Sequence, residues 1–159
     1  KRLKAFNSNI IAYDILYDEA FLKEYNIEPV SLDELFSRSD FISLHIPVSA
    51  DTMDFINRDN LSKVKKGAVL INTARGELID EDALYENLIS KHLRCAAIDT
   101  FKSEPPAAGN KLITLPQVII TPHMGAATDN ASNEMTRISI DECLAVLKGK
   151  KPNYAVIEP

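Results

Sequence analysis

The sequence predicts an α/β fold with a doubly wound parallel sheet. Short apolar runs that suit buried strands alternate along the chain with amphipathic segments that suit helices, a rhythm typical of parallel sheets with helical crossovers. The apolar runs also end in polar residues at five successive places, namely Asp14, His45, Asn72, Asp99 and Thr121. Because parallel strands place their carboxyl ends along one edge, we expect these residues to line a single crevice, where ligands of open α/β sheets bind.

Composition narrows the classes of protein. A length of 159 residues, with 45% hydrophobic and 26% charged residues, suits one soluble globular domain. A net charge of -5 argues against a nucleic-acid-binding surface, and no apolar run approaches membrane-spanning length. Cys95 lies in an apolar run and Cys143 on a helical stripe, so we expect reduced, buried thiols of a cytosolic protein rather than a disulfide or a metal site.

In the first half of the chain, the capping pattern is the clearest helix signal. Ser31 and Glu34 form a capping box, in which each side chain bonds the backbone amide of the other residue, so a short helix should begin after Ser31. The other predicted elements are the end of a helix at 1–6, a strand at 9–14, a helix at 18–25, a strand at 40–45 closed by Pro47, and a short helix or turn at 60–64.

The second half is organised around residues 66–76. The apolar run 68–71 suits a strand covered on both faces, and it stops at Asn72 and Thr73, followed by Arg75. An acidic stretch at 80–82 then opens a helix at 83–91. The remaining predicted elements are a strand at 94–99, an irregular loop at 101–115, a strand at 117–121, and a long helix from Thr128 with Ile140, Cys143, Leu144 and Leu147 on one face.

Two strand ends suggest binding residues. The guanidinium of Arg75 presents a planar fork of donors at the predicted crevice, which suits an anionic or carbonyl ligand. Asp14 stands where a nucleotide-binding fold bonds the adenosine ribose hydroxyls, or it simply closes a strand. No Arg or Lys follows Asp14 through Glu19, so a ribose 2′-phosphate would be repelled, which favours NAD over NADP.

Candidates for proton transfer follow two other strands. His123 comes directly after the strand at 117–121, where an imidazole can pass a proton near neutral pH. His45 is a rival at another strand end, although its neighbour Pro47 suits a loop-shaping role equally well. Glu104 precedes two prolines that fix the backbone, and a carboxylate beside an imidazole stabilises its charged form; a charged loop residue is the plainer interpretation of Glu104.

Several segments together resemble the D-isomer-specific 2-hydroxyacid dehydrogenases and are similar to the phosphoglycerate dehydrogenase branch and to the related hydroxypyruvate and glyoxylate reductases. The matching segments are 72–76, 99–101 with 104–106, 121–128, and 44–47 with Thr52, in family order through the whole chain. The resemblance implies a Rossmann-like domain and an oxidoreductase that transfers a hydride between NAD(H) and a small 2-hydroxy or 2-oxo acid. It also implies no metal, and we expect a cytoplasmic homodimer.

The same resemblance implies roles for individual residues. Arg75 would bind the substrate carboxylate and carbonyl, His123 would be the acid–base, and Glu104 would pair with His123. Asp14 would hold the ribose and Asp99 the nicotinamide carboxamide. The remaining residues expected at the cofactor are His45, Ile46, Pro47, Thr52, Thr73, Ala74 and Gly125, together with Arg75 and His123 themselves.

One departure from the family pattern concerns the phosphate loop. The five glycines contain no G-x-G, and the family's glycine-rich loop and first strand would precede Lys1. We therefore expect 1–159 to be a single, incomplete nucleotide-binding domain whose substrate domain is largely absent. Two other interpretations remain open: an NAD-responsive binding module like a corepressor of this family, and an inactive truncated remnant.

Overall fold

The computed structural model describes residues 2–155, which fall into two compact units that meet in sequence at Pro122 and His123. In the part of the chain that the structure describes, none of the helices combines the length and the apolar character needed to cross a bilayer.

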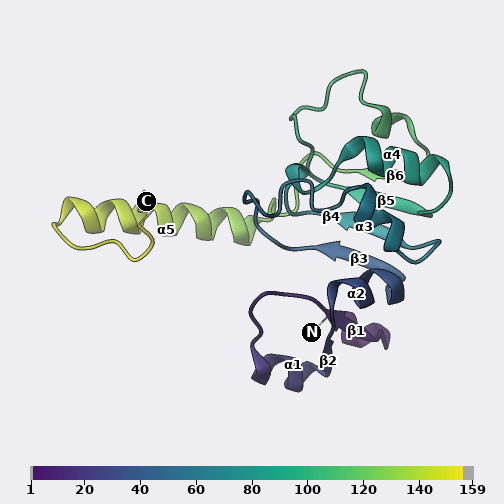
Figure 1. Cartoon of the computed structure of the whole chain (residues 1–159). Coiled ribbons are helices and arrows are strands. Elements are labelled where there is room, and N and C mark those ends of the chain that lie inside the picture. Colours follow the sequence, from purple (N-terminus) through teal and green to yellow (C-terminus); the bar gives the residue numbers. More distant parts are fainter. Residues whose placement is uncertain (1, 156–159) are drawn as a thin grey trace. The chain divides into compact units, whose positions relative to one another are not determined.

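The larger sheet of the first unit is parallel, as the sequence predicts. It contains β3 (Phe41–Leu44), β4 (Val69–Asn72), β5 (Cys95–Ile98) and β6 (Val118–Ile120), in that spatial order. Leu44 pairs with Asn72, which pairs with Ile98, so the carboxyl ends of neighbouring strands lie level at one edge (Figure 1). The predicted crevice therefore has its structural basis in these four strands.

A second, smaller parallel sheet precedes it. Strands β1 (Ile10–Ala12) and β2 (Ile27–Pro29) pair in parallel and are connected by α1 (Glu19–Tyr25). The described strands therefore form two sheets, and no ladder joins β1 to β3. Strand β2 is missing from the prediction, since Ile27 is its only clearly apolar residue and it ends in a proline.

The remaining elements of the described residues are helices. They are the 3-10 helices η1 (Leu3–Phe6), η2 (Gly76–Leu78) and η3 (Lys111–Thr114), and the helices α2 (Leu32–Arg38), α3 (Arg58–Lys63), α4 (Glu81–Ile89) and α5 (Asp129–Leu147). The capping box of Ser31 and Glu34 is confirmed at the start of α2. Asp80 and Thr128 cap α4 and α5 by accepting hydrogen bonds from backbone amides in the first turn.

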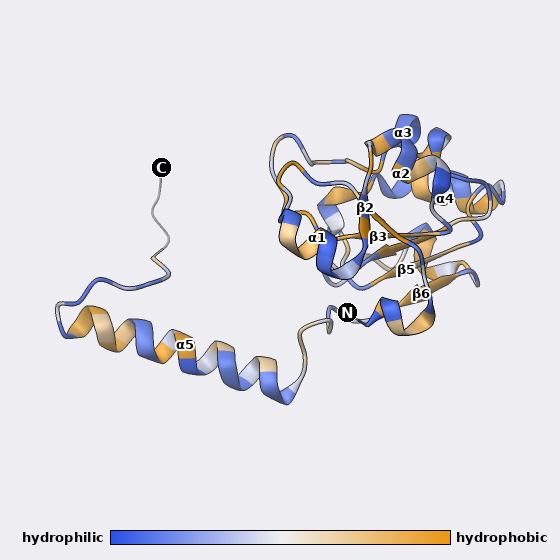
Figure 2. Cartoon of the chain, turned by 90° about the horizontal axis from the view of Figure 1, so that it is seen from below, coloured by the Kyte–Doolittle hydropathy of each residue, from blue (hydrophilic) through white to orange (hydrophobic). Residues whose placement is uncertain are grey.

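The core lies on one face of the larger sheet. Ile42, Leu70, Ala96 and Leu84 belong to a single cluster of buried side chains that α2, α3 and α4 cover, and the strands of this sheet are mostly hydrophobic (Figure 2). The prediction that β4 is covered on both faces is only partly right, because Ile71 is half-buried and Phe41, which pairs with Val69 from β3, is 63% exposed.

The second unit consists mainly of α5. No residue of α5 is buried, and hydrophilic and hydrophobic residues alternate along its length (Figure 2). The stripe that includes Ile140 and Cys143 is exposed, so the predicted burial of Cys143 is wrong; Cys95 in β5 is half-buried. Both thiols are free, as predicted. After α5, the chain turns at Gly149, whose φ of 67° is in the region that favours glycine.

Candidate functional site

An open cleft lies at the carboxyl ends of β3 and β4. Its volume is about 530 Å³, and it lies wholly within the first unit. Seven residues line the cleft: His45, Ile46, Pro47, Val48, Ala74, Arg75 and Glu77. Five of them are residues that the sequence analysis assigns to the cofactor. Four apolar residues, an imidazole, a guanidinium and a carboxylate line the cleft; the apolar residues and the guanidinium have the chemistry that an aromatic cofactor ring and an anionic substrate need.

Asn72 organises the side of this cleft that β4 supplies. Its side chain is fully buried, its Oδ1 accepts a hydrogen bond from the Ala74 amide at 3.0 Å, and its Nδ2 donates to the Arg75 carbonyl at 2.8 Å. A buried amide with these partners fixes the backbone of the next three residues. The sequence shows Asn72 as a strand end, and its positioning role emerges only from these contacts.

Arg75 itself is exposed. Its Nη1 donates to the Ala74 carbonyl at 2.7 Å, and its backbone is extended before η2 begins. Four of the five nitrogen-bound protons of a guanidinium remain for other partners after one such bond. Thr73, beside it, is also exposed.

The segment after Arg75 touches the loop that contains Glu104. A Cβ atom added to Gly76 would lie 2.0 Å from the Phe101 carbonyl carbon and 2.4 Å from the Lys102 nitrogen. Only glycine fits a backbone that approaches another so closely. The first unit therefore brings the segments of Arg75 and Glu104 side by side, although they follow different strands.

Glu104 is exposed, and its carboxylate is held near the start of its own loop. Its Oε1 accepts a hydrogen bond from the Phe101 amide at 3.0 Å. The Phe101 side chain is buried in the core, so this amide belongs to a well-anchored part of the backbone. The prolines that follow were the only sequence signal that this carboxylate has a fixed position.

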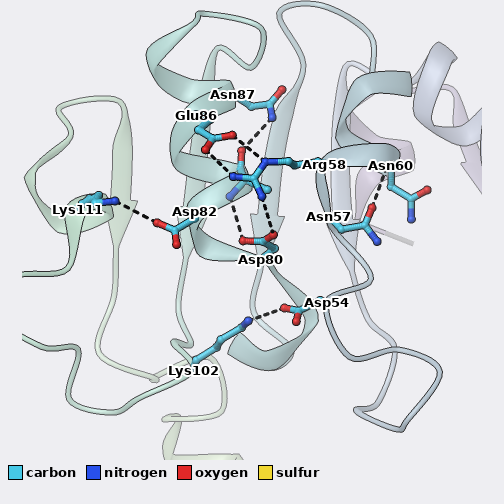
Figure 3. Close-up of polar contacts among 11 residues, drawn as sticks. Asp54, Asn57, Arg58, Asn60, Asp80, Asp82, Glu86, Asn87, Lys102 and Lys111 are labelled. Atoms are coloured by element: carbon cyan, nitrogen blue, oxygen red, sulfur yellow. Dashed lines mark hydrogen bonds and ion pairs between the residues drawn. The ribbon is translucent and has the colours of Figure 1, made fainter.

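The same loop is tied at two further points. Glu81, in the first turn of α4, accepts hydrogen bonds from the Lys102 amide at 3.2 Å and from the Asn110 side chain at 2.7 Å. The Lys102 ammonium pairs with Asp54 at 2.5 Å (Figure 3). The acidic stretch 80–82 predicts only a helix start, so the long-range contact of Glu81 was not predicted from the sequence.

Asp99 follows β5 and is buried. Its Oδ1 accepts a hydrogen bond from the Thr121 hydroxyl at 2.5 Å, and its backbone amide donates to the Asn72 carbonyl. Three of the predicted strand-end residues, on β4, β5 and β6, are thus in direct contact. Next to Asp99, the Thr100 hydroxyl is buried and has no hydrogen-bond partner in residues 2–155.

His45 and Thr52 belong to the other side of the cleft. The Nε2 atom of His45 lies 2.9 Å from the Ser43 hydroxyl. The Thr52 hydroxyl donates to the Pro47 carbonyl and accepts from the Ser49 amide, both at 2.7 Å. Thr52 does not line the cleft; its bonds close the turn at 47–52 and so shape the loop that does.

Asp14 stands two residues beyond β1 and is exposed. Its Oδ1 accepts hydrogen bonds from the Ile15 amide at 2.7 Å and the Leu16 amide at 3.3 Å. These bonds hold the carboxylate in a defined direction at the carboxyl end of a parallel strand. This is the place and the chemistry that bonding to ribose hydroxyls requires.

His123 and Gly125 begin the second unit. His123 is exposed and has a φ of 49°, which is uncommon for a residue other than glycine. The residue after the strand end Thr121 is Pro122, so the chain turns sharply at this point.

A group of ion pairs lies away from the cleft, between α3 and α4. Arg58 bonds Glu86 with two nitrogen atoms, at 2.5 and 3.0 Å, and approaches Asp80 at 3.9 Å (Figure 3). The bond from Arg58 holds the pKa of Glu86 below its usual value. These exposed pairs connect two helices and are structural. Within 2–155, no group of three or more His, Cys, Asp or Glu residues could hold a metal ion.

The fold and the cleft define a nucleotide-binding α/β domain, and comparison assigns it to a family. Residues 1–125 match the model of the D-isomer specific 2-hydroxyacid dehydrogenase, NAD binding domain, and the chain belongs to this family. The parallel sheet, the long C-terminal helix and the resemblance predicted from the motifs are confirmed. NAD is the cofactor of this domain family.

Individual relatives support the same family assignment. The chain is 42% identical over its full length to D-3-phosphoglycerate dehydrogenase of Methanocaldococcus jannaschii, of which it covers 30%, and 45% identical over 85% of its length to hydroxypyruvate reductase of Thermotoga maritima, of which it covers 44%. The structure of D-lactate dehydrogenase with NAD+ from Lactobacillus jensenii matches with a TM-score of 0.89 and 30% identity, covering 99% of this chain and 51% of that one. The chain thus spans less than half the length of these curated relatives.

Proposed function

We propose that the chain is the NAD-binding part of a longer dehydrogenase that interconverts a small 2-oxo acid and the corresponding D-2-hydroxy acid. The observation that supports this proposal most is the cleft at the carboxyl ends of β3 and β4, which is lined by Arg75 and four other residues of the family motifs. The names of the relatives favour phosphoglycerate-, hydroxypyruvate- or glyoxylate-type substrates. The whole of 1–159 would then be one incomplete nucleotide-binding domain.

In this proposal, three residues handle the substrate. Arg75 anchors the carboxylate and stabilises negative charge on the carbonyl oxygen, because its fork of donors can bond both groups. His123 gives a proton to the forming alkoxide in reduction and takes it back in oxidation. Glu104 pairs with the His123 ring and favours its protonated form.

NAD(H), when bound, supplies or accepts the hydride. The residues of this chain hold the cofactor: Asp14 bonds the ribose hydroxyls, Ile46 and Ala74 contact the apolar rings, and Asp99 orients the carboxamide. His45, Pro47, Thr73 and Gly125 complete the proposed contacts, and Thr52 supports them by closing its turn. The exposed position of Asp14 and the cleft lining of Ile46 and Ala74 fit these roles.

The function is tested by turnover of the full-length protein. Oxidation of NADH should occur with glyoxylate, hydroxypyruvate or its phosphate, and a chiral product should be the D-isomer. NADPH should be a poor replacement, because Asp14 repels the 2′-phosphate. NADH binding without turnover on any 2-oxo acid would favour the NAD-responsive binding module. Equal efficiency with both cofactors would remove the role of Asp14.

The isolated 159 residues give a further test. Because they contain no G-x-G sequence, we expect weak NAD binding by this segment alone. Calorimetry that shows tight NAD binding would contradict this expectation, whereas a full-length protein that neither binds NADH nor turns over a 2-oxo acid would favour the truncated remnant. We also propose a cytoplasmic homodimer, on the strength of the family resemblance, and light scattering of the full-length protein measures its mass.

A further inference from the structure

The loop that contains Glu104 is held at both ends by one carboxylate. Glu81 accepts a hydrogen bond from the Lys102 amide at 3.2 Å with Oε1, and from the Asn110 side chain at 2.7 Å with Oε2. The two partners are the second and tenth residues after Thr100, and Glu104 lies between them. Each carboxylate oxygen thus serves a different end of the same segment.

Few other contacts hold the two ends of residues 102–110. The loop has no regular hydrogen bonding between Phe101 and Asn110, and its own Asn110 side chain also caps η3 by accepting from the Leu112 amide at 2.9 Å. Glu81 is half-buried, so its bonds to uncharged donors are shielded from water more than those of an exposed side chain. Loss of Glu81 would leave Lys102 held by its packing against Gly76 and by the exposed pair with Asp54, and Asn110 only by bonds within residues 107–112.

The position of the loop bears on the site because of Gly76. The backbone of Gly76 lies against Phe101 and Lys102, directly after Arg75. A shift of the Lys102 amide would move the Phe101–Glu104 segment relative to Arg75, because the bond from the Phe101 amide fixes the Glu104 carboxylate. An error of about 1 Å in such a position can reduce a rate by about 100-fold.

We propose that Glu81 is a positioning residue for Glu104: it holds the two ends of residues 102–110 so that the Glu104 carboxylate keeps its place beside Arg75. This role rests on the proposed dehydrogenase function. Glu81 itself touches neither substrate nor cofactor in this account. It acts through the loop backbone, and its contribution should disappear when Glu104 can no longer act.

The test compares Glu81→Ala with Asp82→Ala in the full-length protein. Asp82 is the next residue of the same helical turn and has the same charge, but its partner is Lys111, beyond the segment 102–110 (Figure 3). We expect Glu81→Ala to lower kcat for 2-oxo acid reduction by about 10-fold to 100-fold, and Asp82→Ala to change it by less than about twofold. The KM for the 2-oxo acid should change little, because Asn72 fixes Arg75 independently.

Two further variants separate positioning from general stability. In a Glu104→Gln background, Glu81→Ala should cause almost no additional loss of kcat, whereas a merely structural effect would add to it. Glu81→Gln keeps one acceptor oxygen and should recover part of the activity. Amide hydrogen exchange at Lys102 should be faster in Glu81→Ala than in Asp82→Ala.

The outcomes distinguish this inference from the function on which it rests. A wild-type protein without turnover defeats the dehydrogenase function, and the positioning role with it. An active wild type in which Glu81→Ala and Asp82→Ala behave alike, or in which the losses from Glu81→Ala and Glu104→Gln simply add, defeats the positioning role alone.

Discussion

Two irregular segments of this chain are each tied to a helix by one carboxylate, but their surroundings differ. In the first unit, Glu81 of α4 holds the loop 102–110, and the loop is flanked by the buried side chains of Phe101 and Leu112. In the second unit, Glu142 of α5 accepts bonds from the Asn153 amide at 2.6 Å and its side chain at 3.0 Å, without a buried residue on α5.

The difference separates the effect of hydrogen bonds to a carboxylate from the effect of apolar burial. Polar bonds specify the course of a segment, but burial of apolar groups supplies most of the free energy that keeps it there. We therefore expect the loop at 102–110 to be a fixed part of the first unit. The segment at 149–154 should depend on the charge of Glu142.

The largest effect on stability is expected where the loop meets the rest of the first unit. Gly76→Ala should destabilise the protein by about 3 kcal/mol or more, because the new methyl group would overlap the Phe101 carbonyl carbon. Gly109→Ala is the matched control in the loop itself, since a Cβ there meets nothing within 4 Å. Equal melting temperatures of the two variants in thermal unfolding would contradict the close approach of Gly76 to the loop.

A smaller effect of opposite sign is expected at Thr100. Its buried hydroxyl has no partner in the described residues, so Thr100→Val should stabilise the protein by about 1 kcal/mol. Thr121→Val, where the hydroxyl donates to Asp99, should instead destabilise it. Denaturant unfolding of the two variants checks the sign, and a loss of stability in Thr100→Val would show that its hydroxyl is well satisfied.

The smallest expected effect is the loss of the hydrogen bonds to Glu142, in the second unit, at acid pH. Hydrogen bonds from the Asn153 side chain and from the amides of Tyr154 and Asn153 hold the pKa of Glu142 below its usual value. A lowered carboxyl pKa means that the stabilisation is complete above the usual pKa, near 4.5, and is lost as the pH falls through the lowered value. The Asn153 amide signal in NMR spectra should therefore shift only below about pH 4.5, and Glu142→Gln should show the shifted signal at neutral pH. An Asn153 signal that changes neither at low pH nor in Glu142→Gln would contradict the hydrogen bonds between Asn153 and Glu142.

Local patterns predicted most of the fold. The capping box at Ser31 and the strand ends at Asn72 and Asp99 depend on residues that are close in sequence, so the sequence displays them directly. Strand β2 was missed because a short edge strand with a proline has no alternation to detect. The helical stripe through Cys143 predicted an apolar face on α5, but a stripe does not show what covers it.

The site was predicted less completely than the fold. Motif residues such as Arg75 and Glu104 were found because their types suit the chemistry and their segments resemble a family. The supporting contacts were not, because Glu81 and Asn110 are 29 residues apart and no periodicity connects them. Sequence thus identified the residues proposed to react, and the structure was needed to find those that hold them.

The central claim is that this chain supplies the acid–base of a dehydrogenase, and His123→Ala in the full-length protein tests it most directly. With NADH and a 2-oxo acid that the wild type reduces, we expect kcat to fall by about 100-fold to 10,000-fold, because no other proposed group can give the alkoxide its proton. The melting temperature should stay the same, since His123 is exposed. A folded His123→Ala protein with near-normal turnover would contradict the account, and His45 would become the next candidate.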